Sequence, residues 1–229
     1  MLRILSQYVF SLIVVGNAFH CHGQKEDFSK LYKTGGTLYI SAPDGLTLND
    51  KAGLNGTKIR MISYGSLVLV QKDTQQQVVT STDNIGGHWV KVKSDSAEGY
   101  VFDGYLSRWL PVGEREAGKS YFDKISRIRA TDKKSPHASI RDYEKIIYEN
   151  GVVYESKIFE TGSVTSITIP QNVITLQETW LLATALFSNY RNTLCKYNPA
   201  GIRCTDGSSR VLNVKREGAS LIIREEVKE

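Results

Sequence analysis

Short apolar runs alternate with polar positions from Thr37 to Leu110, and turn signals separate them. TLYIS (37–41), YGSLVLVQ (64–71) and HWVKVK (88–93) have the two-residue period of β-strands with one buried face. Five to six such runs within about 70 residues favour a small closed unit over an open sheet. The pattern therefore predicts a small all-β barrel over residues 37–110.

The hairpin made by HWVKV and GYVF divides its side chains between two faces. Because side chains alternate along a strand, Val90 and Val92 share one face, and Val101 joins them from the next strand. Trp89 and Tyr100 fall on the opposite face, where the alternation predicts an aromatic cross-strand pair. We expect the valines in the barrel core and the aromatic pair outside it.

Two interpretations of this aromatic pair stay open at this point. In the first, Trp89 and Tyr100 cover the edge of the barrel or pack against the second half of the chain. In the second, they line a ligand-binding groove, and Tyr39, His88 and Lys91 supply polar contacts to a sugar or a peptide. These five residues are the candidate ligand-binding residues.

The second half of the chain has a different pattern. IIYENGVVYES (146–156) places Asn150-Gly151 between alternating apolar residues, which predicts a hairpin with a type I′ turn. SVTSITI (163–169) predicts a third strand. SRVLNVKR and SLIIREEV flank Glu217-Gly218 and predict a final hairpin.

One helix is predicted between these strands. Thr175 and Glu178 have the Thr-x-x-Glu spacing of a capping box at the start of LQETWLLATALFSNY (176–190). Most of this segment is apolar, so the helix must be covered, and the sheet is its expected cover. Residues 121–229 are therefore predicted to form an α+β domain of about β-β-β-α-β-β order, joined to the barrel by a linker at 111–120.

Several segments within 37–110 resemble, in order, the motifs of the bacterial SH3 (SH3b) domain. They are GLTLND (45–50), Gly65 before an apolar strand, Trp89-Val90-Lys91-Val92, Gly99-Tyr100-Val101 and Tyr105-Leu106. The sequence departs from the usual pattern at Thr47, Asn49 and Tyr100, where Asn, Arg and Trp are usual. The resemblance implies a small SH3-like barrel in an exported bacterial protein. It also implies a targeting module, and some members bind peptidoglycan or its peptide stems. Residues 121–229 carry no such resemblance.

The first 23 residues have the pattern of a secretory signal peptide. Arg3 supplies the positive start and YVFSLIVV (8–15) the apolar centre, and the chain then turns small and polar. The uncharged span is shorter than the ~20 residues that a membrane-spanning helix needs. Cleavage after Gly23, cleavage after Ala18 and lipidation of Cys21 are the alternatives, in that order of preference. A retained, uncleaved anchor is the less favoured alternative to a cleaved signal. We expect an exported protein, periplasmic or extracellular, with no transmembrane segment after signal removal.

Cleavage after Gly23 would leave two cysteines, Cys195 and Cys204. An even pair within CKYNPAGIRC indicates a disulfide that closes a short loop, and two unpaired thiols are the alternative. The formal net charge of +5 falls to +4 without Arg3 and is spread along the chain. This mild excess argues against a nucleic-acid-binding function.

No catalytic or metal-binding motif is present: the sequence lacks HExxH, CxxC, GxSxG and a Gly-rich phosphate loop. Outside the signal segment the histidines are His88 and His137, and His137 lies in a polar loop where a surface position is expected. The two cysteines are explained by each other, and Glu178 by its capping role. We expect no enzyme activity, no metal and no cofactor.

The leading hypothesis is an exported, non-enzymatic binding or adaptor protein. Its barrel would contact cell-wall peptidoglycan or another envelope component, and the α+β domain would add a surface for a partner or a small ligand. The alternative is a cell-envelope hydrolase with its active site in residues 121–229. A third hypothesis, a structural subunit of a larger assembly, predicts that the protein co-purifies with a partner.

Overall fold

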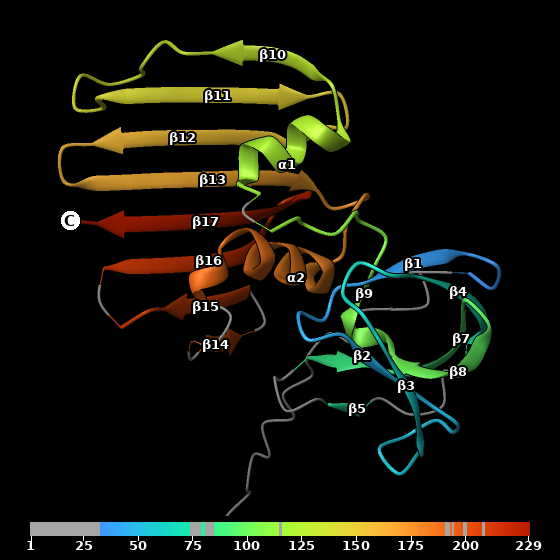
Figure 1. Cartoon of the computed structure of the whole chain (residues 1–229). Helices are drawn as coiled ribbons and strands as arrows, with labels where there is room; N and C mark the ends of the chain where they lie inside the picture. The colour runs from blue at the N-terminus through green and yellow to red at the C-terminus, as the bar shows by residue number, and fades with distance from the viewer. Residues whose placement is uncertain are drawn as a thin grey trace, which may run out of the picture.

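The computed structural model (Figure 1) contains two large antiparallel β-sheets and, in its described part, two α-helices. It describes residues 33–73, 79–80, 85–114, 116–190, 193, 195–198, 201–207 and 209–229. The predicted signal segment, with its cleavage alternatives and the lipidation of Cys21, lies outside the described residues.

Seven strands of the N-terminal half form one antiparallel sheet in the order β3-β2-β8-β7-β4-β1-β9. They are β1 (Thr37–Ile40), β2 (Leu46–Asn49), β3 (Lys58–Ile62), β4 (Leu67–Asp73), β7 (Trp89–Ser94), β8 (Ala97–Phe102) and β9 (Leu106–Ser107). Buried side chains from all seven strands meet inside, so the sheet curves around a core of its own (Figure 1). Val90, Val92 and Val101 are fully buried in this core, as predicted.

A small second sheet and a 3-10 helix complete this half. β5 (Val79–Thr80) and β6 (Gly86–Gly87) form a separate two-stranded sheet. A 3-10 helix, η2 (Asp103–Tyr105), joins β8 to β9. Both connect strands of the larger sheet.

A tight turn at Asp95 joins β7 to β8 and fixes their register. In that register Trp89 lies opposite Phe102, while Tyr100 lies opposite Lys91. The predicted cross-strand pair of Trp89 and Tyr100 is therefore wrong. Alternation places the two aromatic residues on one face, but the position of the turn makes them diagonal neighbours instead of partners.

Eight strands of the C-terminal half form a second antiparallel sheet in the order β10-β11-β12-β13-β17-β16-β15-β14. They are β10 (Ile128–Asp132), β11 (Asp142–Tyr148), β12 (Val153–Phe159), β13 (Gly162–Pro170), β14 (Cys195–Asn198), β15 (Gly201–Thr205), β16 (Arg210–Glu217) and β17 (Ser220–Lys228). Two α-helices, α1 (Gly118–Ile125) and α2 (Leu176–Leu186), lie on one face of this sheet (Figure 1). A 3-10 helix, η3 (Ser188–Tyr190), follows α2. The predicted antiparallel α+β character of this half is confirmed.

Helix α2 begins as predicted. Thr175 is its N-cap, and the Thr175 hydroxyl accepts the Glu178 backbone N–H at 3.1 Å. In return Glu178 Oε2 accepts the Thr175 backbone N–H at 3.0 Å. Residues 180–183 are buried, and the helix packs against β16 and β17, so the sheet covers it as expected.

Helix α1 was not predicted, and it begins at Gly118, inside the predicted linker 111–120. Its N-cap is Ala117, which carries no side-chain acceptor, so the usual start signal is missing. The helix is held instead by Tyr121 and Phe122, both fully buried. Ser120 Oγ accepts the Ala117 backbone N–H at 3.1 Å, and the packing of the two buried rings adds to this local contact.

The predicted order β-β-β-α-β-β is incomplete at both edges of the sheet. β10 was missed because all five of its residues are exposed, so they show no alternation. β14 and β15 occupy the segment that was predicted as a cysteine loop. The described part of this half therefore runs α-β-β-β-β-α-β-β-β-β.

The predicted hairpin at Asn150-Gly151 is present, but its turn type differs from the prediction. Gly151 has a φ of +84°, whereas Asp95 is the one non-glycine residue with positive φ in the described part of the chain. The Gly151 N–H donates to the Tyr148 carbonyl at 3.0 Å, which closes a turn before the glycine. This matches a three-residue loop with glycine in the left-handed position, not a type I′ turn.

Cys195 and Cys204 form the predicted disulfide. They lie directly opposite each other on β14 and β15, with their Cα atoms 4.2 Å apart. The bond thus ties the edge strand of the second sheet to its neighbour. No helix in the described residues is long and apolar enough to cross a membrane.

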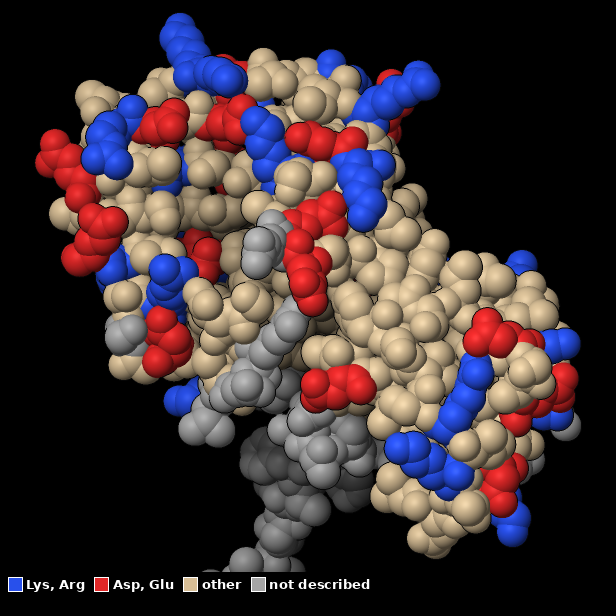
Figure 2. All heavy atoms as spheres, in the orientation of Figure 1, with Lys and Arg blue, Asp and Glu red and all other residues tan. Residues whose placement is uncertain are grey.

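The two halves of the chain share a core. Ile85, Trp89 and Phe102 from the first half pack in one cluster with α1, α2 and the covered face of the second sheet. On the face shown in Figure 2, the surface to the right of the grey atoms, where the halves meet, carries few charged side chains. The seam between the halves is therefore a packed interface.

Candidate functional site

Trp89, the leading candidate from the sequence, is a core residue. Its side chain is 9% exposed and belongs to the cluster that joins the two halves. Its ring centroid lies 6.3 Å from that of Phe102, and the Phe102 ring is 6.1 Å from that of Tyr105. Of the two interpretations left open, the arrangement of Trp89 agrees with packing against the second half.

Lys91 and Tyr100 face each other across β7 and β8. Lys91 Nζ lies 3.4 Å from Glu98 Oε2. Hydrogen bonds from Gln71 and Lys91 lower the pKa of the exposed Glu98 carboxyl. Tyr100 is half-buried and packs against the shared core. Neither Lys91 nor Tyr100 lines the hollow that contains Tyr39.

His88 is part of a turn built around a buried carboxylate. Asp103 is fully buried, and its Oδ1 accepts the His88 backbone N–H at 2.6 Å. The Asp103 N–H donates in turn to the His88 carbonyl at 2.9 Å. His88 Nδ1 lies 3.7 Å from Asp103 Oδ2. A Cβ atom on Gly87 would come within 2.5 Å of Asp103 Oδ1, so the turn is closely packed.

Tyr39 is the predicted candidate that lines a hollow. The hollow lies at the seam and has a volume of about 310 Å³. It is lined by Tyr39, Arg108, Trp109, Leu110, Ile125, Asn150 and Val173. The structure thus does not bring the five predicted residues together in one site. It places one of them, Tyr39, with aromatic, polar and apolar residues from both halves.

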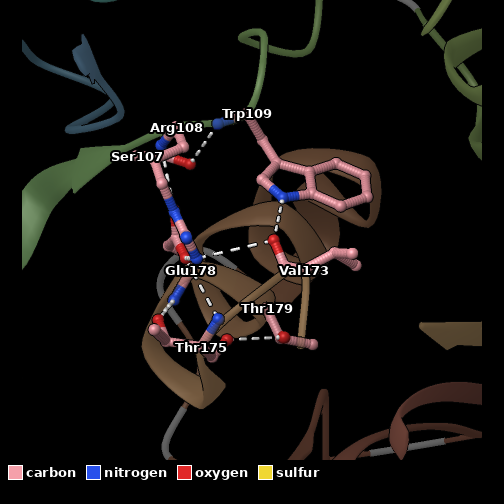
Figure 3. A network of polar contacts seen from close by, with 7 residues as sticks. All are labelled: Ser107, Arg108, Trp109, Val173, Thr175, Glu178 and Thr179. Atoms are coloured by element: carbon pink, nitrogen blue, oxygen red, sulfur yellow. Dashed lines mark hydrogen bonds and ion pairs between the residues drawn. The ribbon is translucent and has the colours of Figure 1, made fainter. Parts of the chain in front are cut away.

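Arg108 carries the charge of the hollow, and Glu178 balances it (Figure 3). The Arg108 Nη2 donates to Glu178 Oε2 at 2.7 Å, and Nε donates to Oε1 at 3.2 Å. The Arg108 backbone N–H also donates to Oε1, at 2.9 Å. The hydrogen bond with Glu178 raises the pKa of Arg108. The wall of the hollow therefore holds a guanidinium whose charge is already neutralised.

Trp109 is held rigidly at the same place. Its indole N–H donates to the Val173 carbonyl at 3.2 Å, and its backbone N–H donates to Ser107 Oγ at 3.0 Å (Figure 3). The Phe122 ring of α1 packs edge-on against it, with centroids 6.2 Å apart and an interplanar angle of 79°. A ring held by a hydrogen bond and an aromatic contact, on a backbone that is itself hydrogen-bonded, is preorganised for contact with a ligand.

Asn150 and Tyr39 bring unused hydrogen-bond donors to the hollow. Asn150 Oδ1 accepts the Val152 N–H at 3.2 Å, an Asx-type contact that fixes the side chain. Its amide nitrogen and the Tyr39 hydroxyl have no hydrogen-bond partner among the residues that the structure describes. Arg108 Nη1 is likewise left over after the contacts with Glu178. The hollow thus presents free hydrogen-bond donors. Arg108, the one charged residue among the described residues that line it, is balanced by Glu178, so the site carries no net charge.

Sequence reasoning missed Arg108, Asn150 and Val173 as site residues. The sequence predicts only a turn at Asn150, and no periodic pattern marks Arg108. The one local signal was Trp109, an aromatic residue directly after the last predicted strand. The hollow lies where it does because the two halves pack together. The pattern of residues within one strand carries no information about that packing.

Two further titratable side chains that could serve catalysis are His137 and Glu225. His137 is exposed, as predicted, and its Nδ1 lies 2.8 Å from Ser139 Oγ. Within the described ranges, no group of three or more His, Cys, Asp or Glu side chains is placed to hold a metal ion. Glu225 is a largely buried carboxyl whose pKa is raised by burial, and Arg210 lies 3.7 Å from it. Neither Glu225 nor His137 lines the hollow that contains Tyr39.

The resemblance of residues 37–110 to SH3b domains rests on the sequence motifs. The curved antiparallel sheet is compatible with it and does not by itself identify the family. A search of family models, curated proteins and solved structures finds no match to this chain.

Proposed function

We propose that the chain is an exported, non-enzymatic binding or adaptor protein that contacts peptidoglycan or another component of the cell envelope. The N-terminal half is its SH3b-like barrel. Export is supported by the signal-like N-terminal segment and by the disulfide between Cys195 and Cys204.

The observation that carries this proposal is the hollow at the seam. Ligand sites are concave, mostly apolar, and contain a few fixed polar groups. The hollow combines the rings of Tyr39 and Trp109 with the polar groups of Arg108 and Asn150. Trp109 and Arg108 are both held in place by α2 and the segment before it, so the site is built before a ligand arrives.

This arrangement gives each half of the chain a role. The barrel supplies Tyr39, the segment after β9 supplies Arg108 and Trp109, and the second half supplies Asn150 and Val173. A ligand in the hollow would contact both halves. The α+β domain therefore acts as the second wall of the binding site.

Sedimentation with insoluble peptidoglycan tests the proposal. We expect the wild-type protein to move into the pellet and Tyr39→Ala to stay largely in the supernatant. Tyr100→Ala is the matched control, since Tyr100 is a half-buried tyrosine of the same sheet outside the hollow. Equal recovery of wild-type protein in the supernatant with and without peptidoglycan would reject the cell-wall function.

A further inference from the structure

We propose that the hollow binds an N-acetylated amino sugar and recognises its acetamido group. This inference rests on the proposed function and makes it more specific, because it selects the glycan part of the envelope polymer over its peptide part. It follows from the charge, the donors and the apolar wall of the hollow.

The charge balance favours a neutral ligand. Arg108 is the charged residue among those that line the hollow, and Glu178, 1% exposed, neutralises it from below. A ligand carboxylate at this place would add a second negative charge beside one guanidinium. A neutral glycan adds none, whereas a peptide stem with free carboxylates does.

The free hydrogen-bonding groups are donors. They are the Asn150 amide nitrogen, Arg108 Nη1 and the Tyr39 hydroxyl, which can also accept. Such a set suits a ligand rich in neutral acceptors. An acetamido carbonyl is the strongest neutral acceptor on a sugar, and its two lone pairs can take two of these donors.

The remaining wall is apolar and aromatic. Leu110, Ile125 and Val173 provide aliphatic surface for the acetamido methyl group. The rings of Tyr39 and Trp109 provide flat apolar surface for the C–H face of a sugar ring. The volume of about 310 Å³ lies at the small end of ligand sites, which fits one sugar with its substituent.

An NMR titration of the ¹⁵N-labelled full chain tests the inference. The probe is N,N′-diacetylchitobiose, and cellobiose, which has hydroxyls in place of the acetamido groups, is the matched control. We expect the acetylated sugar, but not cellobiose, to cause saturable chemical-shift changes of the Trp109 indole N–H and the Asn150 side-chain NH₂. Equal shifts with cellobiose would overturn the inference.

A conservative variant gives a second readout. Asn150→Asp keeps the oxygen that accepts the Val152 N–H but removes the free donors, and we expect roughly tenfold weaker binding of the acetylated sugar. Asn55→Asp makes the same chemical change at an exposed loop position and should bind like wild type. Unchanged affinity in Asn150→Asp would contradict the assigned role of the amide.

Two further outcomes separate this inference from the proposed function. If the protein sediments with peptidoglycan but does not respond to the acetylated sugar, the function stands and the sugar inference fails. If a soluble stem peptide shifts the Trp109 and Asn150 resonances instead, the occupant is peptide and the inference also fails. A failure of both sedimentation and titration rejects both proposals.

Discussion

Arg108 and Glu178 lie 70 residues apart in the chain and meet at the seam between the two halves, joined by three hydrogen bonds to one carboxylate. Glu178 also accepts the Thr175 N–H and so completes the start of α2 (Figure 3). One side chain therefore caps a helix and fixes a wall of the hollow. The stability of the second half and the shape of the site are linked through this carboxylate.

Glu178→Gln separates these two roles. Glutamine keeps the capping-box spacing, but it leaves the Arg108 guanidinium without its counter-charge. Because the Arg108 side chain is 36% exposed, we expect a loss of about 2 kcal/mol in the free energy of unfolding, less than for a fully buried pair. Urea denaturation followed by circular dichroism measures this change.

Glu226→Gln is the control for this substitution. Glu226 pairs with Arg224 at 2.9 Å on an exposed surface, so its loss should cost about 0.5 kcal/mol or less. A Glu178→Gln variant as stable as Glu226→Gln would contradict the structural role of the pair at the seam.

Trp89→Ala is expected to destabilise the packing between the two halves. It is not expected to remove a ligand contact. Its side chain fills the shared core, so truncation should lower the free energy of unfolding by about 3–5 kcal/mol. Tyr100→Ala, at a half-buried position, should cost clearly less. Urea denaturation of both variants checks the difference. If the Trp89→Ala protein has wild-type stability but no longer binds ligand, Trp89 lines a binding groove and this prediction is wrong.

Features encoded within one segment could be predicted from the sequence. The buried valines follow from alternation along β7 and β8, and the start of α2 follows from the spacing of Thr175 and Glu178. The disulfide follows from two closely spaced cysteines. Each signal is complete within about ten residues, which is why sequence reasoning finds it.

Features set by contacts between segments could not be predicted. The Trp89–Phe102 pairing depends on where the β7–β8 turn falls, and one residue of difference changes every partner. Helix α1 lacks an N-cap side chain and is held by its buried rings. The hollow draws on Tyr39, Arg108 and Asn150, which belong to three separate segments. No pattern within one segment reports their meeting.

The Cys195–Cys204 disulfide is expected to hold the edge of the second sheet. The two cysteines are 9 residues apart in sequence, and replacing both by alanine should lower the free energy of unfolding by about 2–3 kcal/mol. Faster amide hydrogen exchange in β14 and β15 should accompany the loss. Wild-type protein under reducing conditions is the control and should behave like the double variant. Unchanged exchange in these strands would show that the sheet edge does not depend on the bond.

Glu225 should make the stability of the protein depend on pH. Burial raises the pKa of its carboxyl above the ordinary value of 4.5, although Arg210 and Tyr190 favour the charged form. Because the folded state holds this proton more tightly than the unfolded state, the stabilising contribution is fully present below pH 4.5. It is lost as the pH rises through the folded-state pKa.

The neutral isostere Glu225→Gln removes this titration. We expect the variant to gain stability relative to wild type as the pH rises from about 4 to about 8. Urea denaturation at several pH values gives the difference between the two proteins. Glu144→Gln is the matched control with the opposite sign, because a hydrogen bond from Lys119 lowers the pKa of Glu144. Its ion pair stabilises wild type above pH 4.5, so that variant should lose stability relative to wild type over the same rise. A Glu225→Gln curve parallel to wild type would show that Glu225 titrates alike in the folded and unfolded chain.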